Sequence, residues 1–383
     1  MHTGSVANPH CRDPLRIVVT DEGWNSIMRP KWSAVGVMTV AAVAWMAAPG
    51  ISSASNAHSA IPRYQHILEF MLENTSYATI IGNPNAPKLN ALADNYGLAT
   101  NYFGVTHPSE PNYVANIGGS NFGIQDDNAF YCTAALASTD PHCAGSTVDH
   151  TVTAQNLGDQ LTAAGLTWKG YFQNLPPIPP TGLITSGPNA NGPYTFKFPS
   201  NSDALYASKH NPFLNFTGTQ GALANMVPDT QLATDLATGD LPNFSYIVPD
   251  QCHDMHGIGP CPDVNSLISA ADTYVGNTVA EIMASPTWRH GRNAIVITWD
   301  EDDFSDIGAP GTGCCGANPG GGQVVTIVIT NQGQYPVRDN TPYNHYSLLR
   351  SFEDAFRLPC LANACDIADG VRPMTPLFHP DGN

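Results

Sequence analysis

Ser109 stands between two prolines in the segment THPSEPNY, residues 106–113. A serine hydroxyl is a weak nucleophile at neutral pH and needs a neighbouring base or cation to stabilise its alkoxide. Earlier in the chain, the strand-like run 66–72 ends in Glu73 and Asn74, whose side chains carry oxygen donors. This combination predicts a nucleophilic serine that faces a pair of metal ligands.

Polar residues that could act in catalysis or bind a metal follow the ends of four apolar runs of the chain. They are Glu73 and Asn74 after residues 64–72, Ser109 after 98–105, Asp250, His253, Asp254 and His256 after 244–248, and Asp300 and Glu301 after 294–299. A single acid at a strand end is more often a helix cap or a loop residue. In open α/β sheets, however, ligands bind beyond the carboxyl ends of the strands, so four such clusters indicate one functional crevice.

The alternation of short apolar runs with helical patterns predicts the fold class. The expected strands are residues 64–72, 98–105, 166–172, 244–248, 294–299 and 324–330, and the expected helices are 89–96, 157–164, 267–282 and 348–356. This order favours an α/β protein with a mainly parallel central sheet and helices on both faces. The stretches 175–202 and 308–322, rich in Pro, Gly or Asn, are expected to be long surface loops.

The ligand types indicate the chemistry of the crevice. Glu73, Asn74, Asp300 and Glu301 offer oxygen donors that suit a hard divalent cation such as Mg²⁺, Ca²⁺ or Mn²⁺, while nearby histidines extend the choice to Zn²⁺. The hydroxyl oxygen of Ser109 would complete the ligand shell. A metal ion held there would activate the hydroxyl and direct it at a phosphorus atom.

Phosphoryl transfer depends on positioning and electrostatic stabilisation, and further residues are expected to supply both. The amide of Asn112 is expected to stabilise charge on the non-bridging phosphate oxygens. Asp254 and His256, together with His253, are expected to hold a second cation, or to protonate the leaving oxygen and activate the water that cleaves the phosphoserine.

The composition limits the partners of the chain. Of its 383 residues 42% are hydrophobic, which is ample for a buried core, and the formal net charge is −17. Such a charge argues against nucleic acid and anionic membrane surfaces as partners. An anionic substrate therefore needs a local positive charge, which a bound metal cation could provide.

Residues 1–57 are expected to be a leader rather than part of the fold. Two basic residues precede the apolar run 34–48, and a stretch of small residues ends at Ala57. This pattern is typical of a secretory signal, with Met28 as the true start of the chain. The alternative is an uncleaved anchor, but a run of about 15 apolar residues is short for a membrane span. We therefore expect an exported protein in which residues 58–383 form a single domain.

Removal of the leader would leave eight of the nine cysteines, an even number that favours disulfides in an exported protein. The pairs that could close short loops are Cys132 with Cys143 and Cys360 with Cys365. The adjacent Cys314 and Cys315 cannot both reach one partner. They are therefore expected to form two bridges with Cys252 and Cys261 that tie two loops together.

Seven short segments, each weak alone, are specific in their order. They are ENTSY at 73–77, PN at 111–112 leading to GG at 118–119, LTWKGY at 166–171, KHNPF at 209–213, CHDMH at 252–256, WDE at 299–301 and HYS at 345–347. In this order they resemble the bacterial phosphoesterases that include phospholipases C and secreted acid phosphatases, which are related to the alkaline phosphatase superfamily. The resemblance covers most of residues 64–358.

The resemblance implies an alkaline-phosphatase-like core with Ser109 as nucleophile. The implied metal ligands are Glu73, Asn74, Ser109, Asp300 and Glu301. It also brings His210 and His345 into the active site and makes His107 a candidate contact for the substrate. Family members can carry an Arg or a similar residue where this chain has Tyr113, so a positive contact to phosphate is missing at that position.

The function expected from the sequence is secreted, metal-assisted hydrolysis of phosphate monoesters through a phosphoserine intermediate. The substrate would be a small-molecule or lipid phosphate ester, with phosphoinositides among the candidates. A phospholipase C that cleaves phospholipid headgroups is an alternative, and a sulfatase or phosphomutase could use the same scaffold. A non-catalytic exported metal-binding domain would instead place Ser109 far from Glu73 and Asp300.

Overall fold

The computed structural model describes residues 61–128, 130–139, 143–175, 205–304 and 312–378, all within one compact unit. The expected leader, almost all of the expected loop 175–202 and the first residues of the expected loop 308–322 lie outside the described residues.

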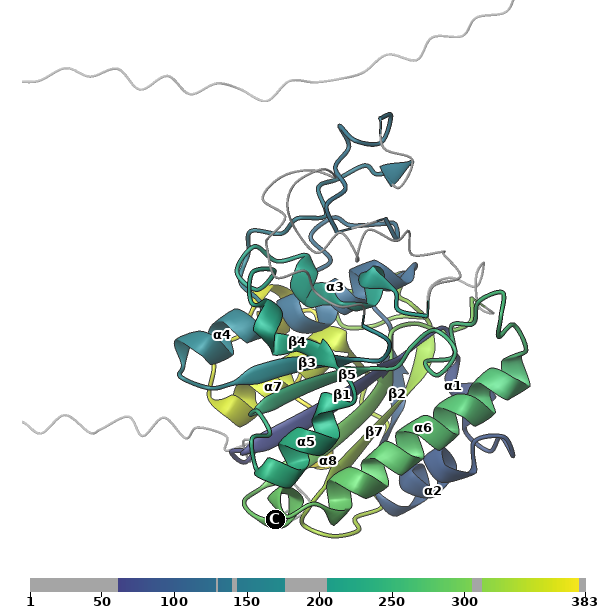
Figure 1. Ribbon diagram of the computed structural model, residues 1–383, viewed down its shortest axis with the longest axis vertical. Helices are drawn as coiled ribbons and strands as arrows, with labels where there is room; N and C mark the ends of the chain where they lie inside the picture. Colours follow the sequence, from purple (N-terminus) through teal and green to yellow (C-terminus); the bar gives the residue numbers. More distant parts are fainter. Residues whose placement is uncertain (1–60, 129, 140–142, 176–204, 305–311, 379–383) are drawn as a thin grey trace, which may run out of the picture. The chain divides into compact units, whose positions relative to one another are not determined.

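A nine-stranded sheet lies at the centre of this unit (Figure 1). Its strand order is β4-β3-β5-β1-β6-β7-β2-β8, and β9 also pairs with β2. The strands are β1 His66–Leu72, β2 Gly97–Phe103, β3 Trp168–Phe172, β4 Met226–Pro228, β5 Phe244–Val248, β6 Asn293–Trp299, β7 Gln323–Thr330, β8 Arg338–Asp339 and β9 Tyr343–Asn344. All six strands expected from the sequence are confirmed, because apolar and β-branched runs of this length form buried strands.

The pairing directions bring the strand ends together. β1 pairs in parallel with β5 and β6, and β3 pairs in parallel with β4 and β5. Among the strands of the described residues, only β7 reverses direction, and it runs antiparallel to both β6 and β2. The register aligns Leu72 with Trp299, and the amide of Asp300 donates to the carbonyl of Leu72 at 2.9 Å. Glu73 and Asp300 therefore leave neighbouring strands side by side.

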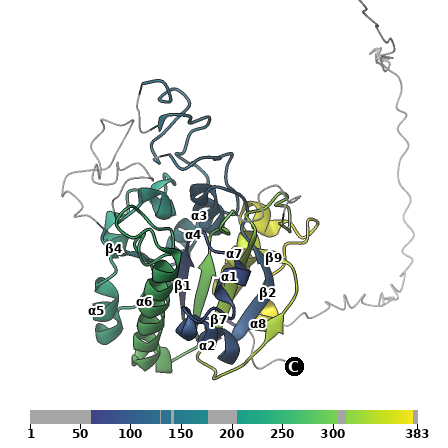
Figure 2. The ribbon, with the colours of Figure 1, turned by 90° about the vertical axis from the view of Figure 1, so that its right-hand side faces the viewer.

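Helices cover both faces of the sheet, as the sequence predicts (Figures 1 and 2). They are α1 Tyr77–Ile80, α2 Pro87–Asn95, α3 Ser109–Gly118, α4 Leu157–Ala163, α5 Gln231–Thr238, α6 Val264–Ala284, α7 His345–Phe356 and α8 Thr375–Phe378. α2 packs with α6, whereas α3 and α4 pack with α7. Among the described residues, none of the helices is both long and apolar enough to cross a bilayer.

Helix α3 is the missed element that matters most for the site; α1, α5, α8 and the short strands β4, β8 and β9 were also not predicted from the sequence. Ser109 is its first residue rather than part of an isolated turn, and all ten of its residues are buried. Pro111 is tolerated because it lies in the first turn, where amide groups have no partner within the helix. The helix ends at Gly118 and is capped by Gly119, which has φ 76° and approaches the carbonyl of Leu361 too closely for a Cβ atom.

The expectation of two disulfides between distant loops was wrong. The structure forms Cys252–Cys261 and the adjacent pair Cys314–Cys315, besides the expected Cys132–Cys143 and Cys360–Cys365. Two adjacent cysteines can bond to each other when the backbone turns between them, and Cys315 has a φ of 58°. Cys314 and Cys315 therefore need no partners in another loop.

Glu69 in the middle of β1 should make stability depend on pH. Its side chain is fully buried, and burial raises its pKa to about 8 even though Asn116 donates a hydrogen bond to it at 2.9 Å. Between about pH 5 and 8 the folded state therefore holds a proton that the unfolded state has lost, so stability falls as pH rises, by up to ~1.4 kcal/mol per pH unit.

The Glu69→Gln variant keeps the acceptor for Asn116 and removes this titration. We expect its melting temperature relative to wild type to increase as the pH rises from 5 to 8, measured by thermal unfolding in matched buffers. A constant difference across this range would contradict the prediction.

Candidate active site

Ser109 lies within hydrogen-bonding reach of two buried carboxylates. Its Oγ donates to Oε2 of Glu73 at 2.9 Å and lies 3.3 Å from Oε1 of Glu301. All three side chains are buried. The serine also begins α3, so the helix dipole favours negative charge at this position. The separation that a non-catalytic metal-binding domain would show between Ser109 and Glu73 is absent.

Asn74 and Asp300 join this group through the backbone at the ends of β1 and β6. The amide of Asn74 donates to Oδ1 of Asp300 at 3.1 Å, and its side-chain Nδ2 donates to Oε2 of Glu73 at 3.0 Å. Asn74 adopts a φ of 46°, which asparagine tolerates better than most residues. The structure thus brings all five predicted metal ligands together: Glu73, Asn74, Ser109, Asp300 and Glu301.

The donor atoms of this group fit a divalent cation. Oε1 of Glu73, Oδ1 of Asn74 and Oδ2 of Asp300 are buried without a hydrogen-bond partner. Burial, and then the negative charge of Glu73, raise the pKa of Asp300 and Glu301 well above the usual range. A buried carboxylate without a partner is costly, and a cation bound to these oxygens would offset that cost.

A second set of donors shares Glu73 and adds imidazole nitrogens. Nε2 of His210 lies 2.9 Å from Oε1 of Glu73, without the geometry of a hydrogen bond, and its Nδ1 lies 3.2 Å from Oδ2 of Asp254. Glu73, His210 and His256 each offer one ligand atom, and these atoms lie within 4.8 Å of one another. Nitrogen donors suit Zn²⁺ better than Mg²⁺ or Ca²⁺.

Lys209 is a site residue that the sequence analysis did not identify. It is almost completely buried, and its Nζ donates to Oδ2 of Asp127 at 2.8 Å and to Nε2 of His256 at 3.1 Å. Burial would lower its pKa, but the charges of Asp127 and Glu73 raise it, so the ammonium keeps its charge. Lys209 thus places a buried positive charge beside Glu73 and His256, although position 113 itself holds no cation. The sequence could have indicated Lys209, because it is one of few basic residues in the chain and directly precedes His210.

Tyr113 fills the position where family members can carry a cation. Its ring stacks on His210, with centroids 5.0 Å apart and planes at 7°. Tyr113 therefore contacts the histidine that follows Lys209 in the chain.

His107 and Asn112 hold the segment that leads into Ser109. Nδ1 of His107 lies 2.7 Å from Oε2 of Glu301, and its ring stacks on Phe304 at 4.2 Å. Oδ1 of Asn112 accepts hydrogen bonds from the amides of residues 105 and 106, while its Nδ2 lies 3.3 Å from Oε2 of Glu301. The amide expected to face phosphate is therefore already used largely by the protein backbone.

His345 and His253 contact protein groups other than Ser109. Nε2 of His345 lies 2.7 Å from the carbonyl oxygen of Asp300, and its Nδ1 lies 2.9 Å from the hydroxyl of Tyr102. Burial lowers the pKa of His345 to about 4, so it is neutral. His253 pairs with Asp250 at 2.8 Å and packs against α6. Both rings hold protein segments in place.

A family model and several known proteins are similar to this chain over most of its length. The sequence model of the Phosphoesterase family matches residues 82–359. A phosphatidylinositol-3-phosphatase of Mycobacterium tuberculosis is 28% identical over 85% of this chain and 87% of its own length. An acid phosphatase of Aspergillus fumigatus is 26% identical over 78% of this chain, which spans 56% of that protein.

One solved structure supports the fold alone. A protein from work on glycosaminoglycan metabolism in Bacteroides thetaiotaomicron superposes with a TM-score of 0.50 and 10% identity. The match covers 84% of this chain and 82% of that one. Identity this low carries no statement about substrate.

Cation binding should be visible in stability without any measurement of activity. We expect Mg²⁺, Ca²⁺, Mn²⁺ or Zn²⁺ to raise the melting temperature of chelator-treated protein by roughly 5 °C or more at a concentration of about 100 times Kd. Glu73→Gln should lose most of this shift, because Glu73 belongs to both donor sets. Asp94→Asn, at an exposed acid that pairs with Arg338, is the matched control and should keep the shift. Equal shifts in all three proteins would contradict the assignment.

Proposed function

The chain belongs to the Phosphoesterase family and is a phosphoric ester hydrolase, and we propose that it cleaves phosphate monoesters through a phosphoserine at Ser109. The observation that carries this proposal is the position of Ser109 Oγ, 2.9 Å from Glu73 and 3.3 Å from Glu301 at the start of a buried helix. A serine that served only packing would have no need of two buried acids.

In the first step, Ser109 Oγ bonds to phosphorus while the bond from phosphorus to the leaving oxygen breaks, and the leaving oxygen takes up a proton. In the second step, the oxygen of a water molecule bonds to phosphorus, the bond from phosphorus to Ser109 Oγ breaks, Oγ takes up a proton, and inorganic phosphate is released. The carboxylates of Glu73 and Glu301 hold the hydroxyl proton and orient an oxygen lone pair toward the substrate. A divalent cation held by Glu73, Asn74, Asp300 and Glu301 would stabilise the serine oxygen and the negative charge of the phosphate. Asn112 and His107 both contact Glu301 and so hold it close to the segment that carries Ser109.

Lys209 and His256 act on the phosphate and on proton transfer. The buried ammonium of Lys209 offers charge to the non-bridging oxygens, which gain from positive charge throughout phosphoryl transfer. Nδ1 of His256 lies 2.8 Å from the carbonyl of Gly257, so its Nε2, which accepts from Nζ of Lys209 at 3.1 Å, is the unprotonated nitrogen that takes up a proton. His210, which lies between Glu73 and Asp254, would orient these two residues and take part in the proton transfer.

His345 has a supporting role in this proposal. It fixes the carbonyl of Asp300 from behind, with its other nitrogen held by Tyr102. We therefore assign it as a positioning residue, whereas Ser109, His210, Asp254 and His256 surround the reacting atoms.

Replacing the nucleophile tests the proposal. Ser109→Ala should reduce hydrolysis of p-nitrophenyl phosphate by on the order of 10³-fold or more, because no other hydroxyl takes its place. Ser266→Ala, which removes a hydroxyl from the exposed start of α6, is the control and should retain activity. Trapping of a phosphorylated peptide that contains residue 109 would support the intermediate; full activity in Ser109→Ala would refute it.

The proposed substrate class is the phosphate monoester, including phosphoinositides. The named relatives are a phosphatidylinositol-3-phosphatase and acid phosphatases, although the chain spans little more than half of the fungal proteins. The net charge of −17 disfavours binding to an anionic lipid surface, so soluble phosphate esters are favoured over esters in a membrane.

A substrate panel separates this proposal from a phospholipase C. We expect turnover of p-nitrophenyl phosphate and of soluble phosphoinositides to exceed that of bis-p-nitrophenyl phosphate, with no release of phosphocholine from phosphatidylcholine vesicles. Preferential cleavage of the diester or of phosphatidylcholine would favour the phospholipase reading.

Export is proposed on the same basis. The four disulfides of the described residues persist best in an oxidising compartment. The small-residue stretch before Ala57 provides the expected cleavage site. Sequencing the amino terminus of protein recovered outside the cell would test it.

A further inference from the structure

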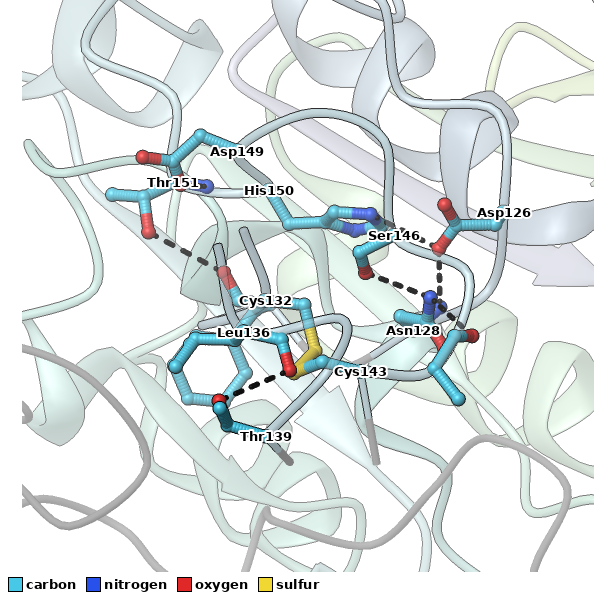
Figure 3. The surroundings of a disulfide bond; sticks show 12 residues. Asp126, Asn128, Cys132, Leu136, Thr139, Cys143, Ser146, Asp149, His150 and Thr151 are labelled. Atoms are coloured by element: carbon cyan, nitrogen blue, oxygen red, sulfur yellow. Dashed lines mark hydrogen bonds and ion pairs between the residues drawn. A yellow bond between two sulfur atoms is a disulfide. The ribbon is translucent and has the colours of Figure 1, made fainter. Parts of the chain in front are cut away.

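His150 is a completely buried histidine held between two carboxylates outside the predicted site. Its Nδ1 lies 2.9 Å from Oε1 of Glu110, and its Nε2 lies 3.1 Å from Oδ1 of Asp126. Figure 3 shows its ring directed at Asp126, above the disulfide Cys132–Cys143. Burial would lower the pKa of His150, but the charges of Glu110 and Asp126 raise it to about 10.

The two partners of His150 lie at different places along the chain. Glu110 follows the nucleophile and belongs to the first turn of α3, where Asn215 also donates to its Oε1 at 2.7 Å. Asp126 belongs to the loop after α3, and the backbone amide of His150 donates to the carbonyl of Cys132 at 2.9 Å. The histidine therefore connects the disulfide-bridged segment, the loop and the start of the nucleophile helix.

The residue next to Asp126 reaches the site. Oδ1 of Asp127 accepts from the amide of Glu110 at 2.9 Å, and its Oδ2 accepts from Nζ of Lys209 at 2.8 Å. One carboxylate thus contacts both the first turn of α3 and the buried ammonium. Its position depends on how the neighbouring Asp126 is held.

We propose that His150 is a positioning residue for phosphate binding: by clamping Asp126 to Glu110 it fixes Asp127, which in turn aims Lys209 at the phosphate. This inference rests on the proposed function in one respect, because it takes Lys209 as the phosphate contact. Loss of the contacts of His150 with Glu110 and Asp126 should leave Ser109 in place and lower the affinity for phosphate.

The test measures binding of inorganic phosphate to the full-length mature protein, by calorimetry and as inhibition of p-nitrophenyl phosphate hydrolysis. His150→Ala should raise the dissociation constant of phosphate by about tenfold, and Asp126→Asn, a milder change at a partly exposed acid, should act in the same direction. His66→Ala is the matched control: it removes another buried histidine, bonded to the carbonyl of Pro242 at the opposite end of β1. It should lower stability and leave phosphate binding unchanged.

A double-mutant comparison identifies the route. In a Lys209→Met background, His150→Ala should change the dissociation constant by less than about twofold, because the residue that it positions is gone. The same tenfold loss in both backgrounds, or unchanged phosphate binding in folded His150→Ala and Asp126→Asn, would overturn the inference. If Lys209→Met itself left phosphate binding intact, this inference would fail while Ser109-dependent ester hydrolysis could still stand.

Discussion

The site depends on one costly arrangement, the burial of Glu73, Asp300 and Glu301 in one group. Burial and then the charge of Glu73 raise the pKa of Asp300 and Glu301, whereas the burial of Glu73 is outweighed by nearby positive charge, chiefly that of His210, which lowers the pKa of that carboxyl. Three carboxylates in a dry environment cannot all stay charged without nearby positive charge. The described chain offers His210 and Lys209 beside Glu73, and it leaves several acceptor atoms without partners. The excess of buried negative charge over positive charge makes a cation site here physically reasonable. The surrounding elements must hold these side chains close together against their repulsion.

The sheet supplies that rigidity. β1 and β6 are neighbours in strict register, so Glu73 and Asp300 follow two strands whose residues are all buried. The single antiparallel strand, β7, begins where its neighbours end, and it brings the glycine-rich residues 312–322 to the same edge. A Cβ atom on Gly104 would lie 2.6 Å from the carbonyl oxygen of Asp300, so only glycine permits this approach. His345 fixes the same carbonyl from another side.

The features that could be predicted from the sequence are those that a local pattern of residues determines. Buried strands and amphipathic helices have their own periodicity, and polar residues at the ends of parallel strands must meet at one edge, so Ser109, Glu73 and Asp300 could be grouped. Lys209, Asp127 and His150 could not, because their roles arise from contacts between distant loops that carry no periodic pattern. Helix α3 was missed because prolines on both sides of Ser109 indicate a turn as strongly as a helix start.

The disulfides show which part of the molecule needs extra restraint. Each bridge joins cysteines at most 11 residues apart, so each limits the unfolded chain much less than a long-range bridge would. The sheet is held by its own buried strands, whereas Cys252–Cys261 closes the segment that carries His253 and His256, and Cys314–Cys315 lies in the glycine-rich segment before β7. The carbonyls of Cys314 and Cys315 accept from Asn344, whose side chain caps the helix that begins with His345. Local bridges of this kind stabilise the loop conformations on which the buried carboxylates depend, and leave the overall fold to hydrophobic burial.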